Sequence, residues 1–136
     1  MRFTRDLEYA LISLIAMGGE ESVTSARDIA HAYTVPYERL CKILQRLSAA
    51  GILDSMKGAH GGYRLLMNPE RLSLGEIIDA VQGKKKVAPC LEDEACVRAE
   101  TCNIKGGIRN VQSMWENMMA SVTLAELSDQ RFGQSG

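Results

Sequence analysis

The sequence lacks the extremes of composition that mark unusual protein classes. Aromatic residues make up 5% of its 136 residues, prolines number three, and the formal net charge is −1. A nearly neutral chain excludes a polycation that holds nucleic acid by bulk charge alone. Hydrophobic residues at 46% and charged residues at 24% are normal for a folded domain, so extensive disorder is not expected.

Long hydrophobic runs are also absent. The first apolar run, residues 10–17, is shorter than the roughly 20 residues needed to cross a bilayer, and Ser13 interrupts it. Asp6 and Glu8 stand just before this run, where a signal peptide should be free of acidic charge. We therefore expect a cytoplasmic protein without a membrane span. Its length gives room for one core, which makes a two-domain enzyme improbable.

Hydrophobic spacing and capping residues predict a mainly α-helical chain. The predicted helices begin near Thr4, Ser25, Pro36, Ser73, Ile108 and Thr123. Two short strands are predicted over residues 52–56 and 63–66, joined by the glycine-rich residues 57–62. Helix, short turn, helix and glycine-tipped hairpin is the order of a winged helix-turn-helix. We assign this domain to residues 1–83, a cysteine-rich loop to 84–107, and a long amphipathic helix with a C-terminal tail to 108–136.

A helix-turn-helix reads DNA by placing one helix in the major groove, with basic groups nearby for the phosphates. Residues 36–71 contain six basic and three acidic side chains, so positive charge gathers locally. The candidate DNA contacts lie off the apolar stripe of the third helix or in the hairpin loop: Tyr37, Glu38, Arg39, Lys42, Gln45, Arg46, Lys57 and His60. For any single one, an ordinary solvated surface is an equally good interpretation.

Three cysteines, Cys90, Cys96 and Cys102, are spaced evenly in the charged loop. Thiolates are soft ligands for iron clusters or zinc, and three of them leave a fourth ligand to be found elsewhere. A disulfide switch is a further alternative. Cys41 lies beside the core stripe of the third helix, where a packing residue or an incidental surface thiol is expected. The sequence has no nucleotide-binding glycine motif and no Cys-x-x-Cys pair, so an enzyme is not expected and a small redox carrier is the weakest alternative.

The motifs together resemble the IscR and NsrR family of iron–sulfur transcriptional regulators. The resemblance covers nearly the whole chain and is carried by residues 1–4, 9–11, 40–51, 58–65 and 74–78 and by the cysteine trio. It implies a winged helix-turn-helix with a long dimerisation helix, and a homodimer bound to a palindromic double-stranded DNA operator. It also implies a 2Fe-2S or 4Fe-4S cluster in the cysteine loop that controls operator affinity in response to cluster status, nitric oxide or redox state.

The fourth ligand of such a cluster is where the chain departs from part of the family. IscR-like members carry a histidine three residues after the last cysteine, whereas this chain has Lys105, and a protonated lysine is no ligand. NsrR-like members take a carboxylate from the first helix of the partner subunit, and Glu8 stands at the matching position. The resemblance thus implies Glu8 as the fourth ligand, with Asp6 and His31 as substitutes. A first-turn acid that favours its helix dipole is the alternative interpretation of Glu8.

Overall fold

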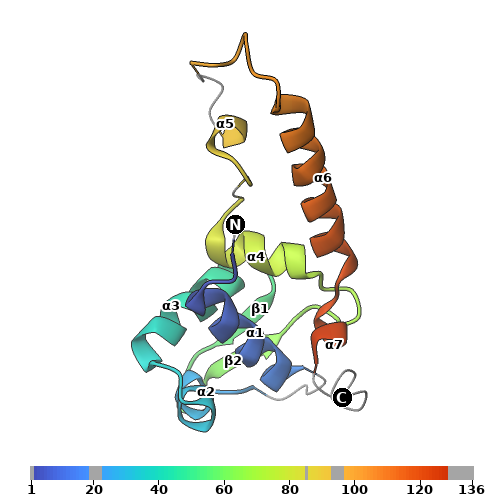
Figure 1. The fold of residues 1–136 in the computed structure, drawn as a ribbon. Coiled ribbons are helices and arrows are strands. Elements are labelled where there is room, and N and C mark those ends of the chain that lie inside the picture. Colours follow the sequence, from blue (N-terminus) through green and yellow to red (C-terminus); the bar gives the residue numbers. More distant parts are fainter. Residues whose placement is uncertain (1, 19–22, 85, 93–96, 129–136) are drawn as a thin grey trace.

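The chain is mainly helical, with one two-stranded hairpin (Figure 1). The structure is a computed structural model that describes residues 2–18, 23–84, 86–92 and 97–128. In chain order, its elements are α1 (Arg5–Met17), α2 (Ala26–Tyr33), α3 (Tyr37–Ala49), β1 (Leu53–Met56), β2 (Gly62–Leu65), α4 (Leu74–Gln82), α5 (Pro89–Glu92), α6 (Lys105–Ser121) and α7 (Leu124–Leu127). The predicted fold class, mainly α with a small β wing, is confirmed.

The helix starts follow from their capping residues. Thr4, Ser25, Ser73 and Thr123 each accept, through the side-chain oxygen, a hydrogen bond from the backbone N–H three residues later. At Ser73 and Thr123 the third helical residue is a glutamate that accepts the N–H of the cap in return. These contacts pair N–H groups that the helix itself leaves without partners. The sequence therefore predicted the starts of α1, α2, α4 and α7 correctly.

The core lies where α1 crosses α3 and α4. Both of these helices pack on α1, while α2 and β1 pack on α3, and α7 packs on α1. The largest side chains that are fully buried are Leu7, Leu14, Met17, Ile29, Leu40, Ile43, Leu44, Leu47, Leu53, Leu72, Ile77 and Leu124. Each buried side chain of this size contributes about 1.5–3 kcal/mol of transfer free energy. This core fixes the orientation of α3 relative to α1 and α4.

The wing is an antiparallel hairpin in which Leu53 pairs with Leu65 and Met56 with Gly62. β2 begins at Gly62, one residue earlier than predicted, because Gly62 continues the pairing instead of the turn. The next residue, Tyr63, forms a bridge with Thr24 through hydrogen bonds of 2.8 and 2.9 Å. A Cβ atom at position 62 would lie 2.4 Å from the Thr24 carbonyl oxygen, so only glycine permits this approach. The bridge holds the wing to the segment that precedes α2.

Helix α6 extends away from the body of the molecule, and its C-terminal end is attached to it (Figure 1). Ser73 and Thr123 form an isolated bridge, and the N–H of Leu74 donates to the carbonyl of Val122 at 2.8 Å. Near that end, Met119 is only 8% exposed and belongs to the same core as Leu124. The last turns of the long helix therefore share the core of the winged helix. The division of the chain at residue 108 stays a prediction.

Two details of the distal segment, residues 84–121, differ from the sequence prediction. Helix α6 begins at Lys105, three residues before the expected start, so Gly106 and Gly107 lie in its first turn. First-turn N–H groups need no helical partner, and the Ile108 N–H already donates to the Ile104 carbonyl at 2.8 Å. The one-turn helix α5 was not predicted either. Within the described residues, no helix combines the length and apolar character needed to cross a membrane.

Candidate functional site

A tight turn sets the angle between α2 and α3. Thr34 ends α2 in the left-handed conformation with a φ of 55°, which is rare for a residue other than glycine. The next residue, Val35, is 5% exposed, and its N–H donates to the Ala30 carbonyl at 3.0 Å. Pro36 then precedes the first residue of α3 with φ already near the helical value. These features form the helix-turn-helix expected from the sequence, in which α3 takes the place of the predicted recognition helix.

The outward face of α3 carries part of the predicted DNA-contact set. Leu40, Ile43, Leu44 and Leu47 are buried on the opposite face. Glu38, Lys42 and Gln45 are exposed, and at 100° per residue they lie together on the side of the helix away from the core. Tyr37 is 40% exposed at the start of the helix. A helix with this face outward fits the width of the major groove.

Arg39 and Arg46, which were predicted to contact DNA, are held by partners inside the chain. Arg39 donates from Nε and Nη2 to the two carboxylate oxygens of Asp6, at 2.5 and 2.7 Å. Its hydrogen bond to Asp6 raises the pKa of Arg39 above its ordinary value. Arg46 Nη1 donates to the Val81 carbonyl at 3.1 Å and lies 3.9 Å from Asp6. Asp6, named as a substitute cluster ligand, thus links the recognition helix to α1.

Arg27, which was not predicted from the sequence, also belongs to this surface. Arg27 is exposed at the start of α2, and its guanidinium lies 4.7 Å from the centre of the Tyr37 ring. A cation over an aromatic face is attracted by the ring quadrupole, so the two side chains position each other. The sequence offered little signal for it, because Arg27 stands in the first turn of α2, ten residues before Tyr37.

The wing places two predicted contacts at its tip. Lys57 and His60 are both exposed between β1 and β2. Across the strands, Arg64 Nη2 lies 3.1 Å from Asp54 Oδ2, so one of the basic charges counted in the sequence is paired within the wing. Behind the hairpin, burial raises the pKa of the Tyr63 hydroxyl, with a smaller contribution from Cys41 on α3. Cys41 is a free, half-buried thiol against the wing.

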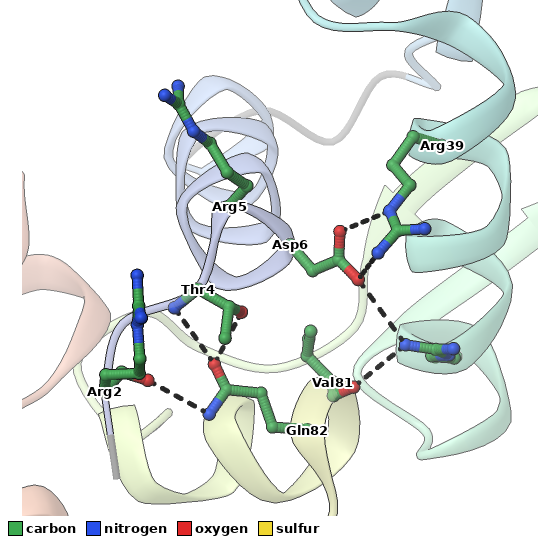
Figure 2. A pocket seen from close by; sticks show the side chains of 8 residues that line it. Arg2, Thr4, Arg5, Asp6, Arg39, Val81 and Gln82 are labelled. Atoms are coloured by element: carbon green, nitrogen blue, oxygen red, sulfur yellow. Dashed lines mark hydrogen bonds and ion pairs between the residues drawn. The ribbon is translucent and has the colours of Figure 1, made fainter.

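A pocket of about 540 Å³ opens between the start of α1, the flank of α3 and the end of α4 (Figure 2). Four arginines line it together with Asp6: Arg2, Arg5, Arg39 and Arg46. Gln82 forms its floor and holds the N-terminal arm. Gln82 Oε1 accepts from the Thr4 hydroxyl at 2.8 Å and from the Thr4 N–H at 3.4 Å, and its Nε2 donates to the Arg2 carbonyl at 3.4 Å. Neither Arg2 nor Arg5 was among the DNA contacts predicted from the sequence.

The cysteine segment, which begins at Lys84 and leads to α6, is attached to that helix through its first residues, Lys86 and Val87. The N–H of Val87 donates to Gln112 Oε1 at 2.7 Å, and Gln112 Nε2 donates to Glu116 Oε1 at 2.8 Å. Lys86 Nζ also contacts Glu116 at 3.2 Å. Gln112 is only 7% exposed, an unusual place for an amide, and its hydrogen bonds account for that burial. Gln112 is a further functional candidate that sequence reasoning missed.

The structure brings some of the predicted ligands into this segment and leaves others apart. Cys90 lies in α5 and Cys102 three residues before α6; both are free thiols and half-buried. Cys96 lies outside the described residues. Glu8 is exposed on α1, and His31 is exposed near the end of α2. Among the residues that the structure describes, no three His, Cys, Asp or Glu side chains gather in a metal-binding group.

Comparison with known proteins gives the class of this chain. The NsrR repressor of Streptomyces coelicolor is 27% identical over 131 residues, which cover 93% of this chain and 88% of that protein. The structure of CymR, the global cysteine regulator of B. subtilis, superposes with a TM-score of 0.73 at 26% identity and covers 96% of this chain and 98% of that one. An oxidized form of Staphylococcus aureus CymR reaches 0.69 at 25% identity, covering 93% and 95%.

These relatives are named as regulators, in agreement with the expectation that the chain is not an enzyme. Residues 3–130 match the model of one family, Rrf2, described as an iron-dependent transcriptional regulator. The match spans nearly the whole chain, including the recognition helix, the wing, the cysteine segment and α6. The protein therefore belongs to the Rrf2 family of transcriptional regulators.

Proposed function

We propose that this regulator holds an iron–sulfur cluster through Cys90, Cys96 and Cys102 and that the state of the cluster controls its affinity for a DNA operator. The observation that carries the proposal is the cysteine segment itself. Its three cysteines are separated by five residues each, and the two that the structure describes, Cys90 and Cys102, are free thiols on the segment that precedes α6, in a chain whose family is described as iron-dependent. Glu8 from the second subunit of a homodimer supplies the fourth ligand in this proposal.

The donor set suits an iron–sulfur group. Cys90 and Cys102 are half-buried rather than enclosed in the core, so both thiols are open to metal. Thiolates are the usual ligands of iron–sulfur clusters, and a carboxylate is a weaker and more exchangeable ligand. When bound, the group supplies redox-active iron with one labile coordination position. The chain itself supplies the attachment at Gln112, which keeps the segment beside α6.

The DNA-reading surface and the cysteine segment meet at the end of α4. The Val81 carbonyl in its last turn accepts from Arg46 of the recognition helix. The cysteine segment starts immediately after this turn, at Lys84. A shift of the segment that displaces this turn would therefore act on α3 through Arg46. A coupling of about 1–3 kcal/mol would change operator affinity from about fivefold to about 150-fold.

The homodimer in the proposal is supported by the surface of α6. Large apolar side chains remain exposed along it, with Met114 70% exposed: Ile104, Val111, Met114 and Met118. They recur at spacings of seven, three and four, which places them along one stripe. A second copy of the helix is the occupant we propose for this stripe. Sedimentation analysis tests it: the wild type should be a dimer, whereas Val111→Glu with Met114→Glu should be a folded monomer.

Cysteine variants test the cluster directly. The protein is purified without oxygen, and iron, sulfide and the visible absorption spectrum are measured for the wild type and for Cys90→Ser, Cys96→Ser and Cys102→Ser. Each variant should lose the cluster, because each removes one thiolate ligand. Cys41→Ser is the matched control, since Cys41 lies on α3 against the wing, and it should keep the cluster. A wild type that stays colourless after reconstitution would refute the proposal.

The assignment of Glu8 has its own test. Glu8→Ala should shorten the lifetime of the cluster in air and change its spectrum, because one coordination position is then filled by solvent. Asp28→Ala is a suitable control, since Asp28 is also an exposed acid in the first turn of a helix. If Glu8→Ala and Asp28→Ala both behave as the wild type, the fourth ligand is not Glu8.

A regulator switched by cysteine oxidation is the second candidate, and the likeness to an oxidized form of a CymR protein favours it over the remaining alternatives. A disulfide switch needs two of the three cysteines, whereas a cluster needs all three. Non-reducing electrophoresis after peroxide treatment distinguishes the two. An oxidation product that survives Ser substitution of one cysteine, in protein that contains no iron or zinc, would favour this candidate. One tightly bound zinc ion per chain would instead favour a zinc site.

A further inference from the structure

The pocket lined by Arg2, Arg5, Arg39 and Arg46 carries a marked excess of positive charge in a nearly neutral protein. Four guanidinium groups face a single carboxylate, Asp6, and the other lining side chains are uncharged: Thr4, Val81 and Gln82. Asp6 binds Arg39 with both oxygens and lies 3.9 Å from Arg46. Its carboxylate therefore fixes these cations in place while cancelling only one of the four charges.

The other two cations lie in the N-terminal arm, which we define as residues 2–5, from Arg2 to the first residue of α1. Gln82 binds the backbone of Arg2 and both the backbone and the hydroxyl of Thr4, so the arm is attached to the end of α4. In Figure 2, Arg2 and Arg5 lie on the side of the pocket opposite Arg39. Within the described residues, the side chains of Arg2 and Arg5 form no ion pair or hydrogen bond. Two unpaired guanidinium groups on a fixed arm are suited to binding an anion from outside the chain.

The position of the pocket relative to the recognition helix points to one kind of anion. Arg39 and Arg46 occupy the flank of α3, beside the outward face that carries Glu38, Lys42 and Gln45. An α-helix with its side chains is about as wide as the major groove, so its flanks lie against the phosphates that border the groove. Across the same pocket, Arg2 and Arg5 add two further cations next to this flank.

We propose that the arginine pocket binds phosphate groups of the DNA backbone beside the recognition helix. Arg2 and Arg5 make the contacts, and Arg39 and Arg46, held by Asp6, position the flank of α3 against the strand. The contact is independent of base sequence and fixes the register of the helix in the groove. The proposal relies on the family's DNA binding and does not depend on the presence of a cluster.

The dependence of DNA affinity on salt tests the proposal. The probe is a 30-base-pair duplex selected by the wild-type protein from a random pool, and a shuffled duplex of equal length serves as the non-specific probe. Fluorescence anisotropy gives the slope of log affinity against log salt. Arg2→Gln and Arg5→Gln should each reduce the slope by about one and weaken binding about fivefold at 0.15 M salt, on both duplexes. Arg2→Lys and Arg5→Lys should keep the slope, because a lysine preserves the charge.

Arg71→Gln is the matched control for loss of one exposed cation. Arg71 lies in the loop between β2 and α4, and this loop contacts Gly18 through Pro69, at the other end of α1 from the pocket. Its slope should equal that of the wild type, and unfolding temperatures should confirm that all variants fold. Unchanged slopes for Arg2→Gln and Arg5→Gln would overturn the proposal. A second result would also overturn it: inorganic phosphate raises the unfolding temperature of the wild type but not that of the variant with both Arg2→Gln and Arg5→Gln, while the two proteins bind DNA with equal affinity. The pocket would then bind a free anion and not the DNA backbone.

Discussion

The winged helix and the distal segment, residues 84–121, differ sharply in how they are held together. In the winged helix, α1, α3 and α4 each bury four or more side chains in one core. In the distal segment, the buried residues that the structure describes are Gln112 and Met119, and Val97 is 96% exposed. The hydrogen bond from Val87 to Gln112 and the ion pair between Lys86 and Glu116 take the place of packing there.

This difference separates the region that the chain supports alone from the region that, in the function we propose, a partner completes. A region with few buried apolar contacts has low local stability, and such regions are where binding and switching elements are found. The exposed stripe of α6 and the free thiols are the groups that a second subunit and a metal would cover. The DNA-reading surface, by contrast, is built on a core that needs neither.

The largest expected effect tests whether only the winged helix has a core. Leu44→Ala removes a side chain that is fully buried between α3 and its neighbours, and should lower the free energy of unfolding by about 3 kcal/mol. Val97→Ala should change it by less than about 0.5 kcal/mol, because the side chain is exposed. Urea unfolding followed by circular dichroism measures both. Similar losses for the two variants would show that the distal segment is packed as tightly as the body.

Glycine substitutions sharpen the same contrast. Gly62→Ala should destabilise the protein by about 2 kcal/mol, since the new Cβ would meet the Thr24 carbonyl and disrupt the bridge to the wing. Gly106→Ala should instead stabilise it by about 0.5–1 kcal/mol, because the position is helical and the added Cβ would meet no atom within 4 Å outside its own helical turn. Thermal and urea unfolding of the two variants measure both changes. A change of the same sign in the free energy of unfolding of the two variants would contradict this prediction.

Gln112 should affect the distal segment without affecting the body. Gln112→Ala leaves the Val87 N–H without its partner, which costs about 1 kcal/mol and frees the segment that leads to Cys90. With the cluster we propose, iron should be lost about fivefold faster to a chelator. Hydrogen exchange should rise in residues 86–92 and stay unchanged in α1 and α3. Gln45→Ala, on the outward face of α3, is the control and should leave the chelation rate as in the wild type.

The smallest expected effect is electrostatic. The hydrogen bond from Gln112, and then that from Lys86, hold the pKa of Glu116 below its ordinary value of 4.5. A carboxylate with a lowered pKa in the folded state stabilises that state above its unfolded pKa, and this contribution is lost as the pH falls through the lowered value. Carbon-detected NMR titration should show the pKa of Glu116 rising in Gln112→Ala. An unchanged titration would mean that this attachment to α6 is absent in solution.

Local patterns in the sequence were sufficient for most of the fold. Capping residues and apolar spacing located α1, α3 and α4, because these signals span only a few residues. The start of α6 was missed since two glycines, usually a stop signal, lie in its first turn. The wing was one residue out because the contact of Gly62 with Thr24 joins positions far apart in the sequence.

The candidate site was harder to predict for the same reason. The exposure of Lys42 and Gln45 follows from helical periodicity, but the partners of Arg39 and Arg46 lie 33 and 35 residues away. Composition showed six basic residues in the region and could not show that Asp6 and Asp54 pair with some of them. Gln112 gave no local signal, since its partner Val87 belongs to a different segment.

The bridge between Ser73 and Thr123 attaches the C-terminal end of α6 to the core, so a tilt of this helix would have its pivot there. A helix of 17 residues is about 25 Å long at 1.5 Å per residue. A tilt of about 10° at the pivot therefore moves the far end by roughly 4 Å, about the length of one residue of extended chain. A displacement of a few ångströms at the end of α6 nearest Cys102 would thus correspond to a rotation of a few degrees where the helix joins the core. The length of α6 sets the ratio between the two.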